Sequence, residues 1–298
     1  MKPRVVILGA AGQLGVELVK LLQSQANLFA FSRRELDLTD DGALRAAILP
    51  LEPHFIVNAA AYTAVDRAES EAVLAQAVNA RAPQSLAELS LRLNAWLLHF
   101  STDYVFDGSA QTPWKETDAP HPLNVYGRTK LEGEKAIAAS GCRHLIFRTS
   151  WVYASRGSNF LRTMLRLGAE RPKLSIVGDQ IGAPTTAGEL ARAVSSILNK
   201  LDEESAAHKL AESGIYHMTC SGSTTWFDFA RAIFASFNGR VSTPELLPIS
   251  TEQYPTPAVR PRYSVLNCDK LEKSFGIRLA PWEDGLAKVI AEIQTEGI

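Results

Sequence analysis

Two side chains spaced four residues apart could carry out proton chemistry in this sequence. Tyr126 and Lys130 would share one face of a helix, with Cβ atoms about 5–6 Å apart. A free tyrosine has a pKa of about 10, and a neighbouring ammonium lowers that pKa and makes the phenol a better acid. Such an acid could protonate a carbonyl oxygen during its reduction. The same spacing is also compatible with a surface helix carrying a half-buried tyrosine, so the rest of the chain must decide.

The composition is that of an ordinary globular enzyme. The 298 residues are 46% hydrophobic and 21% charged, enough for one large domain or two smaller ones. A net charge of −1 and the lack of a basic block argue against a nucleic-acid partner. No apolar run approaches the roughly 20 residues of a membrane span, and no signal-peptide pattern is visible. The three cysteines, Cys142, Cys220 and Cys268, have no metal or redox spacing, so we expect a reducing, cytoplasmic setting.

A glycine-rich turn follows the first expected strand. Residues 4–8 are apolar and β-branched, and Gly9, Gly12 and Gly15 come directly after them, followed by leucines at helical spacing. Glycines let the backbone approach a pyrophosphate, and the helix N-terminus offers free N–H groups. The order strand, turn, helix therefore predicts dinucleotide binding, with a purely structural turn as the alternative.

The end of the second expected strand bears on the choice of cofactor. Ser32, Arg33 and Arg34 follow residues 28–31. An acidic residue here would bind the ribose 2′-hydroxyl of NAD, whereas arginine accommodates the 2′-phosphate of NADP. The two arginines favour NADPH, although a solvated basic loop has the same sequence.

Small and polar residues follow the next strands. Further strands are expected at residues 54–58, 96–100 and 144–148. In open α/β sheets, ligands bind at the carboxyl ends of the strands. The small residues 59–63 and the hydroxyl of Thr102 would lie at that edge, where Thr102 could hydrogen-bond a carbonyl beside the cofactor. His99 lies inside its strand and is interpreted as a packed core residue.

Five strands alternating with helical stretches predict an α/β fold with a doubly wound, Rossmann-type parallel sheet. We expect an NAD(P)-binding domain at residues 1–153, to which residues 187–219 return. Residues 154–186 and 220–298 would form a smaller C-terminal α/β substrate-binding region.

The C-terminal part has weaker patterns. Helices are expected at residues 159–167, 189–198, 224–237 and 286–293, a short strand returning to the sheet at 214–218, and a charged surface helix or loop at 202–213. The Gly/Pro-marked segment 177–185 is more typical of a site than of a core. Residues 254–262 form a proline-stiffened loop whose arginines could hold an anion, or a rigid surface loop.

Together these features resemble the dTDP-4-dehydrorhamnose reductase family within the extended short-chain dehydrogenase/reductase superfamily. The glycine spacing, Thr102 and the pair Tyr126/Lys130 carry the resemblance to the superfamily. Longer strings carry the resemblance to the family, at residues 58–66, 101–108, 122–130, 148–153, 182–185 and 254–261. The resemblance covers essentially the whole chain.

The resemblance implies an enzyme that reduces the 4-keto group of dTDP-4-dehydro-L-rhamnose to dTDP-L-rhamnose. Tyr126 would be the general acid, Lys130 would lower its pKa and bind the nicotinamide ribose, and Thr102 would orient the carbonyl. The hydride chemistry would belong to the cofactor. Residues implied to contact the substrate are Thr102, Asp103, Tyr126, Trp151 and Arg260.

The resemblance also implies cofactor contacts and a metal. The full set of residues expected to contact the cofactor is Gly9, Gly12, Gln13, Leu14, Gly15, Ser32, Arg33, Asp37, Leu38, Ala61, Tyr62, Thr63, Tyr126 and Lys130. NADPH is favoured, but the family also includes users of NADH. Some members form homodimers around Mg²⁺ held by glutamates, and the matching residues are Glu17, Glu189 and Glu292. Carboxylates suit Mg²⁺, although exposed helix glutamates are usually only solvated.

Two other functions remain open. Another nucleotide-sugar 4-keto reductase would share the catalytic residues and differ around Trp151, Gln180 and Arg260. A non-catalytic NADP-binding regulatory subunit could keep the same fold. The intact set of Thr102, Tyr126 and Lys130 argues against the second function.

Overall fold

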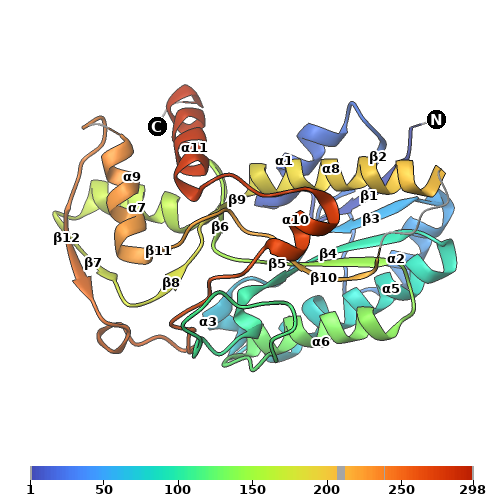
Figure 1. Cartoon of the computed structure of the whole chain (residues 1–298), viewed down its shortest axis with the longest axis horizontal. Helices are drawn as coiled ribbons and strands as arrows, with labels where there is room; N and C mark the ends of the chain where they lie inside the picture. Colours follow the sequence, from blue (N-terminus) through green and yellow to red (C-terminus); the bar gives the residue numbers. More distant parts are fainter. Residues whose placement is uncertain (1, 207–211, 238, 297–298) are drawn as a thin grey trace.

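A six-stranded sheet with all strands parallel lies at the centre of the molecule (Figure 1). The computed structural model describes residues 2–206, 212–237 and 239–296. The strands of this sheet are β1 (Arg4–Leu8), β2 (Asn27–Phe31), β3 (Phe55–Asn58), β4 (Trp96–Thr102), β5 (His144–Thr149) and β10 (Gly214–His217). Their order is β10-β5-β4-β3-β1-β2. The five predicted strands and the returning sixth are confirmed, and β4 reaches two residues further than expected, to Thr102.

Helices cover both faces of the sheet, as a doubly wound fold requires (Figure 1). One face carries α1 (Gln13–Leu22) and α8 (Ala187–Ala206), and the other α2 (Asp41–Ile48), α5 (Ala82–Leu93) and α6 (Val125–Ala139). Successive residues of β1 point to opposite faces: Val5 and Ile7 join one buried cluster, and Val6 and Leu8 join the other. Burial on both faces explains why the strands read as continuous apolar runs.

Short helical turns complete the part of the molecule that contains the six-stranded sheet. They are α3 (Val65–Ala68), α4 (Ala72–Gln76), a π-helical turn (Ala77–Arg81) and 3₁₀ turns at Leu49–Leu51 and Asp103–Val105. The π-helical turn was not predicted, because it continues an ordinary helical sequence pattern into α5.

The remaining elements form a smaller α/β region, most of which lies at the left of Figure 1, whereas the helix Asp269–Phe275 lies beside β10 of the main sheet. Its helices are α7 (Phe160–Glu170), α9 (Trp226–Ser236), a 3₁₀ turn (Thr251–Gln253), α10 (Asp269–Phe275) and α11 (Trp282–Glu296). Its strands are β6 (Val152–Tyr153), β7 (Lys173–Val177), β8 (Ile181–Gly182), β9 (Thr185–Thr186), β11 (Thr224–Thr225) and β12 (Glu245–Ile249), paired as β12/β7, β6/β9 and β11/β8. The expected helices are confirmed: α8 and α11 are longer than expected, α7 ends three residues later, and α9 is shorter, at Trp226–Ser236. Of the charged segment 202–213, residues 202–206 end α8, and 207–211 lie outside the described residues.

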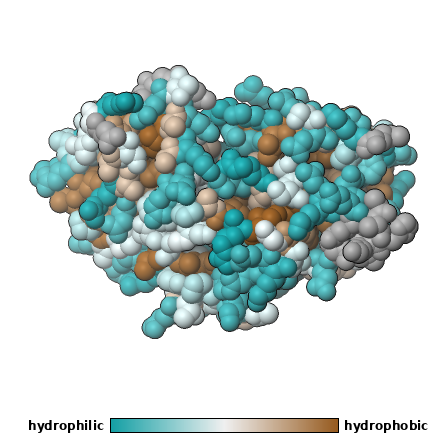
Figure 2. Space-filling view, turned by 45° about the horizontal axis from the view of Figure 1, so that its top comes forward, coloured by the Kyte–Doolittle hydropathy of each residue, from teal (hydrophilic) through white to brown (hydrophobic). Residues whose placement is uncertain are grey.

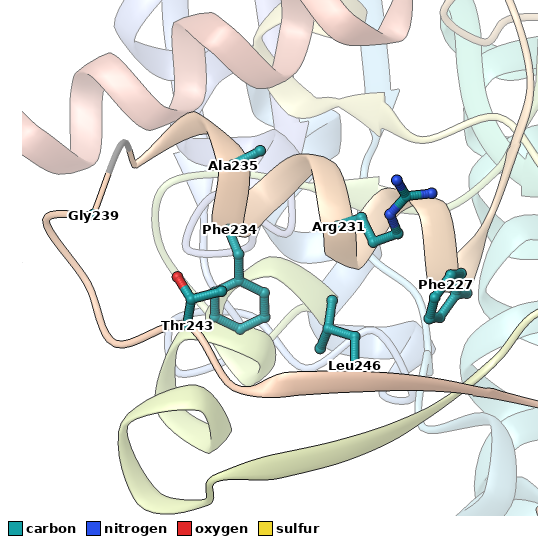
Figure 3. Close-up of a pocket in the computed structure, with 7 residues that line it drawn as sticks. All are labelled: Phe227, Arg231, Phe234, Ala235, Gly239, Thr243 and Leu246. Carbon is teal, nitrogen blue, oxygen red and sulfur yellow. The ribbon is translucent and has the colours of Figure 1, made fainter.

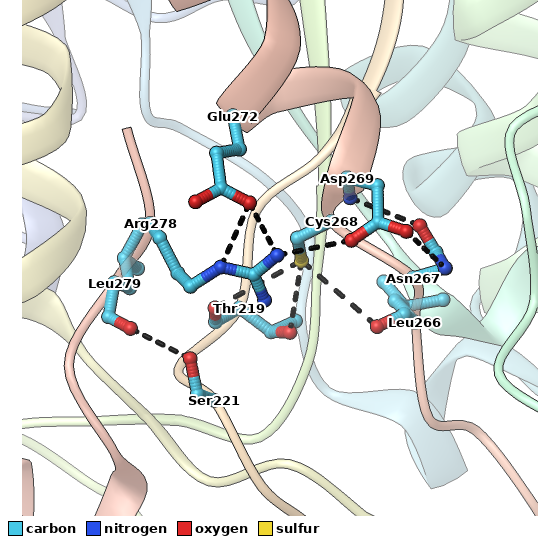
Figure 4. A network of polar contacts seen from close by, with 9 residues as sticks. All are labelled: Thr219, Ser221, Leu266, Asn267, Cys268, Asp269, Glu272, Arg278 and Leu279. Atoms are coloured by element: carbon cyan, nitrogen blue, oxygen red, sulfur yellow. Dashed lines mark hydrogen bonds and ion pairs between the residues drawn. The ribbon is translucent and has the colours of Figure 1, made fainter. Parts of the chain in front are cut away.

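A polar network ties the segment after β10 to the segment that enters α11 (Figure 4). Arg278 is paired with Asp269 and Glu272 of α10. Ser221 Oγ donates to the Leu279 carbonyl at 2.8 Å, and the Cys268 thiol lies 3.4 Å from the hydroxyl of Thr219. These contacts hold α10 and α11 to the sheet.

The surface shown in Figure 2 is mostly hydrophilic, with apolar side chains in separate patches. Within the described part of the chain, no helix is both long and apolar enough to cross a membrane.

Candidate active site

The carboxyl ends of β1, β2 and β3 lie together, with β1 between the other two strands. This is a switch point of the sheet, where the chain leaves in opposite directions, and open α/β sheets bind ligands at such points. Gly9 has a φ of +80°, and a Cβ placed on it would lie 2.8 Å from the Ala60 backbone. A Cβ on Gly15 would lie 2.1 Å from the Gly9 carbonyl oxygen. The loops after β1 and β3 therefore pack backbone to backbone, which only glycine permits.

The first turn of α1 is open to an anion. Its N-cap, Gly12, provides no side-chain hydrogen bond to the helix N-terminus, and Gly12 and Ala11 are exposed. The N–H groups that begin a helix have no partner inside it, and they favour negative charge. Asn159 Nδ2 donates to Gln13 Oε1 at 2.7 Å, so the start of α7 lies beside this turn. Asn159 was not predicted, because its contact with Gln13 spans 146 positions of sequence.

The loop after β2 holds a carboxylate that the sequence prediction did not consider. Arg33 and Arg34 are exposed, as expected of a basic loop end. Glu35 folds back, and its Oε2 accepts the Ser32 N–H at 2.8 Å. Hydrogen bonds from the backbone and side chain of Ser32 lower the pKa of Glu35. A negative charge therefore lies beside the arginines that were predicted to select a phosphate.

Asp37 and Leu38, two further residues of the predicted cofactor set, already have contacts within the protein. Asp37 Oδ1 accepts from the Thr39 N–H at 2.9 Å and from its hydroxyl at 2.8 Å. Leu38 packs against the buried cluster beneath α2. Both residues lie in the loop that follows β2, next to Arg33.

The loop after β3 is fixed by a residue of the π-helical turn. Asn79 Oδ1 accepts the Tyr62 N–H at 2.9 Å, and Asn79 Nδ2 donates to the Tyr62 carbonyl at 3.1 Å and to Thr129 Oγ1 at 3.2 Å. Asn79 thereby joins Ala61, Tyr62 and the exposed Thr63 to helix α6. π-Helical turns often occur at functional sites.

Helix α6 brings Tyr126 and Lys130 to the end of β4. The helix starts where Asn124 Oδ1 accepts the Gly127 N–H at 2.8 Å. A Cβ on Gly127 would lie 2.2 Å from the Tyr104 carbonyl oxygen, so the first turn packs closely on the chain after Thr102. The Thr102 hydroxyl lies close enough to the Tyr126 phenol to lower its pKa. The predicted convergence of a phenol and a hydroxyl is present.

The pKa of Tyr126 differs from the prediction. Burial raises the pKa of Tyr126 to about 12, the Thr102 hydroxyl opposes this rise, and Asp103 adds to it. Lys130 Nζ is turned inward, where it donates to the Phe100 carbonyl at 2.6 Å and lies 3.1 Å from His99 Nε2. Burial lowers the pKa of Lys130 to about 8. Burial therefore raises the pKa of Tyr126 instead of leaving it lowered, and a lowering by Lys130 stays a prediction.

Asp103 is a buried carboxyl group with one unused oxygen. Its Oδ1 accepts from Thr102 Oγ1 at 3.0 Å, and Oδ2 has no hydrogen-bond partner among the described residues. Burial raises its pKa to about 7, although hydrogen bonds from Ser264 and Thr102 act in the opposite direction. Asp103 can therefore bind a hydroxyl group, either as donor or as acceptor.

Trp151 has a strained backbone and a stacked ring. Its φ of +47° is unusual for a side chain of this size. The ring stacks on Trp226 of α9, with centroids 3.4 Å apart and planes 7° apart. A Cβ on Gly182 would lie 2.5 Å from the Trp151 ring, so glycine is required there.

The proline-rich loop 254–262 lies against the start of α6, the helix that carries Tyr126 and Lys130. Asn124 Nδ2 donates to the Val259 carbonyl at 2.8 Å. Arg260 Nη2 pairs with Asp66 Oδ2 at 2.7 Å, and Nη1 donates to Thr256 Oγ1 at 2.5 Å. The loop therefore belongs to the site, and Arg260 is held by Asp66.

The three glutamates of the magnesium prediction do not form a metal site within the described chain. Glu17 and Glu292 line a cavity of about 340 Å³ between α1, α8 and α11. Glu189 is paired with Arg192, and it accepts from Lys288 Nζ at 2.9 Å. Among the described residues, no three His, Cys, Asp or Glu side chains are grouped so that they could hold a metal ion. The two cations satisfy the carboxylate that the metal would need, so the magnesium prediction is not supported.

A second hollow, of about 430 Å³, lies between α9 and β12 (Figure 3). Its walls are mostly apolar, including Phe227, Phe234 and Leu246, with Arg231 at one side. It contains none of the catalytic side chains.

Comparisons with known proteins agree on one family. A family model described as RmlD substrate binding domain matches residues 2–295. The chain is 42% identical to the dTDP-4-dehydrorhamnose reductase of Escherichia coli K12, with 98% of each chain covered. It is 42% identical to that of Burkholderia thailandensis, with 98% of this chain and 100% of the relative covered.

Solved structures agree with this result. The dTDP-4-dehydrorhamnose reductase of Bacillus anthracis in complex with NADP has a TM-score of 0.90 and 38% identity, covering 98% of this chain and 100% of that one. UDP-glucose 4-epimerase of Thermus thermophilus in complex with NAD has a TM-score of 0.78 at 19% identity, covering 98% and 99%, and shows the fold alone.

Proposed function

Because the chain belongs to the dTDP-4-dehydrorhamnose reductase family of extended short-chain dehydrogenases/reductases, and is an oxidoreductase, we propose its reaction. The protein reduces the 4-keto group of dTDP-4-dehydro-L-rhamnose to dTDP-L-rhamnose with NADPH, and Tyr126 is the general acid. One observation supports the assignment of the acid: the Tyr126 phenol lies near the Thr102 hydroxyl at the carboxyl end of β4, the same edge of the parallel sheet that carries the glycine turn after β1.

The proton chemistry follows from the state of Tyr126. With a pKa of about 12, the phenol is protonated at neutral pH and holds the proton that the reaction consumes. A nicotinamide cofactor would supply the hydride to C4, and the carbonyl oxygen would then need a proton, because an alkoxide is a stronger base than phenolate. Tyr126 donates its proton to that oxygen, and the Thr102 hydroxyl orients it. The Tyr126 O–H bond breaks as the new hydroxyl forms.

The residues around the switch point fit a dinucleotide. The space that Cβ atoms would fill at Gly9 and Gly15, together with the uncapped start of α1, supports pyrophosphate binding by Gly12, Gln13 and Leu14. Adenosine contacts are proposed for Ser32, Arg33, Asp37 and Leu38, and nicotinamide-side contacts for Ala61, Tyr62, Thr63, Tyr126 and Lys130. Bacillus anthracis dTDP-4-dehydrorhamnose reductase, in complex with NADP, supports the choice of NADPH.

The substrate is proposed to lie between the two parts of the chain. Asp103 offers its unpaired Oδ2 to a sugar hydroxyl, Trp151 offers a ring face, and Arg260 offers a cation to the diphosphate. Residues 1–153 with 187–219 would bind the cofactor, and residues 154–186 with 220–298 the substrate. A cytoplasmic homodimer remains part of the proposal. Free cysteines fit a reducing compartment, and light scattering of the purified protein tests the dimer.

The experiment supplies NADPH and a panel of nucleotide-linked 4-keto sugars to the purified protein. NADPH consumption is followed by absorbance, and the C4 configuration of the product is determined. We expect the highest kcat/KM with dTDP-4-dehydro-L-rhamnose and formation of dTDP-L-rhamnose. A higher kcat/KM for another nucleotide or sugar would replace the proposed substrate. NADPH binding without turnover of any member would favour a regulatory protein.

A further inference from the structure

His99 connects the catalytic lysine to the loop after β3. It lies in the middle of β4 and is fully buried. Strand register places it beside Asn58 of β3, and its Nδ1 lies 3.0 Å from Asn58 Nδ2. Its Nε2 lies 3.1 Å from Lys130 Nζ. Both ring nitrogens are therefore committed to named partners, which is more than core packing requires.

The position of the ring proton follows from the hydrogen bonds around Asn58. The Ala60 N–H donates to Asn58 Oδ1 at 3.2 Å, so the Asn58 NH₂ group faces His99 and donates to Nδ1. A neutral imidazole with Nδ1 as acceptor carries its proton on Nε2. That N–H points at Lys130 Nζ, which can accept it only as a neutral amine, because an ammonium has no lone pair.

The protonated lysine needs the opposite arrangement. An ammonium at Lys130 donates to the Phe100 carbonyl and to His99 Nε2, so the ring proton must then be on Nδ1. Asn58 satisfies this tautomer by turning its oxygen toward the ring, which gives up its bond from the Ala60 N–H. The ring exchanges its proton with water between the two states, and it stays neutral in both.

Few charged groups act on this cluster. Burial lowers the pKa of Lys130 to about 8, and Glu134, one turn along α6, opposes that change. Glu134 is itself bound by Arg148 of β5 and by Ser101 of β4. Burial, followed by the charge of Lys130, holds the pKa of His99 well below its ordinary value. Lys130 is therefore the member of the pair that changes charge near neutral pH.

We propose that His99 is a positioning residue for Lys130, which holds Nζ by a hydrogen bond in both charge states by changing the ring nitrogen that carries its proton. Lys130 can then release a proton toward Tyr126 or water without leaving its place beneath the site. Only this catalytic consequence rests on the proposed function, because the tautomer change belongs to the protein alone.

The direct test is ¹⁵N NMR of protein labelled in its histidines, titrated from about pH 6 to about pH 10. Protonated and unprotonated ring nitrogens have well-separated ¹⁵N shifts, and the His99 signals are identified by their loss in His99→Gln. We expect Nε2 to gain a proton and Nδ1 to lose one as the pH rises through the Lys130 pKa. In Lys130→Met, the His99 signals should not change with pH. A single tautomer across the range, or a change that persists in Lys130→Met, would overturn the proposal.

Activity provides a second test. His99→Phe keeps the ring volume but removes both polar contacts, whereas the amide of His99→Gln can donate or accept by rotating. We expect His99→Phe to lower kcat about 100-fold with NADPH affinity little changed, and His99→Gln to recover most of the loss. Equal loss in both folded variants, with the pH profile of kcat unchanged, would assign His99 a packing role only. The NMR titration uses no substrate, so it stands even if the proposed reaction fails.

Discussion

Replacing Glu134 by glutamine should destabilise the protein by about 3–5 kcal/mol, because it leaves a buried guanidinium without its counter-charge. The side chains of Glu134 and Arg148 are each only 2% exposed. Arg148 Nη2 lies 2.7 Å from Oε2, and Nε lies 3.0 Å from Oε1. Ser101 Oγ donates to Oε1 at 2.5 Å.

The loss of stability comes from the missing charge and one missing hydrogen bond, not from a change in volume. Glutamine has nearly the volume of glutamate, so no cavity forms. Its NH₂ group would face the N–H groups of Arg148, so one of the two guanidinium contacts is lost. Arg148 remains charged, over the ring of Phe106 at 5.1 Å and near the buried His217. Neither neighbour can replace a carboxylate.

Urea unfolding of four proteins measures this effect: wild type, Glu134→Gln, Arg148→Met and the double variant. The double variant should be more stable than Glu134→Gln, because it no longer buries an unpaired charge. The matched control is Glu170→Gln, in the exposed pair Arg166–Glu170, where the change should stay within about 0.5 kcal/mol. The reasoning is refuted if Glu134→Gln loses less than about 1 kcal/mol, or if the double variant is no more stable than it.

Three further predictions concern the site. Tyr126→Phe should leave NADPH affinity nearly unchanged and lower kcat by about 100-fold or more, and a kcat within a few-fold of wild type would remove Tyr126 as the acid. Arg33→Ala should raise KM for NADPH more than KM for NADH, and equal effects would make residues 32–34 a solvated loop. Asp103→Asn should change how stability depends on pH. Burial raises the folded-state pKa of Asp103 to about 7, so its contribution to stability is complete below about pH 4 and is lost as the pH rises through about 7. The stability of the variant minus that of wild type should therefore be larger at about pH 8 than at about pH 4. The same difference between their urea midpoints at both pH values would contradict this.

The sheet could be predicted because burial on both faces leaves apolar runs in the sequence. Residues 4–8 and 96–100 are read directly as strands for this reason. Strand β12 was missed, because its residues are half exposed and include Pro248. The π-helical turn was missed because its residues have ordinary helical preferences.

The placement of Tyr126 and Lys130 on one helix could be predicted, but their electrostatics could not. Spacing places Tyr126 and Lys130 on one helix face, but it does not say how deeply that face is buried. Burial determined the pKa of Tyr126, and contacts between α6 and β4 determined the partners of Lys130. The place of His99 inside a strand predicts a core residue, and its polar partners could not be read from the sequence because they lie 31 and 41 positions away.

The close packing of Gly182 against the Trp151 indole limits the order in which these two positions can change during evolution. An alanine at position 182 would place its Cβ 2.5 Å from the ring, so it becomes tolerable only after Trp151 has been replaced by a smaller residue. The reverse order passes through a variant in which the ring must leave its stack with Trp226. Divergence at this pair would therefore begin at position 151, and position 182 would follow.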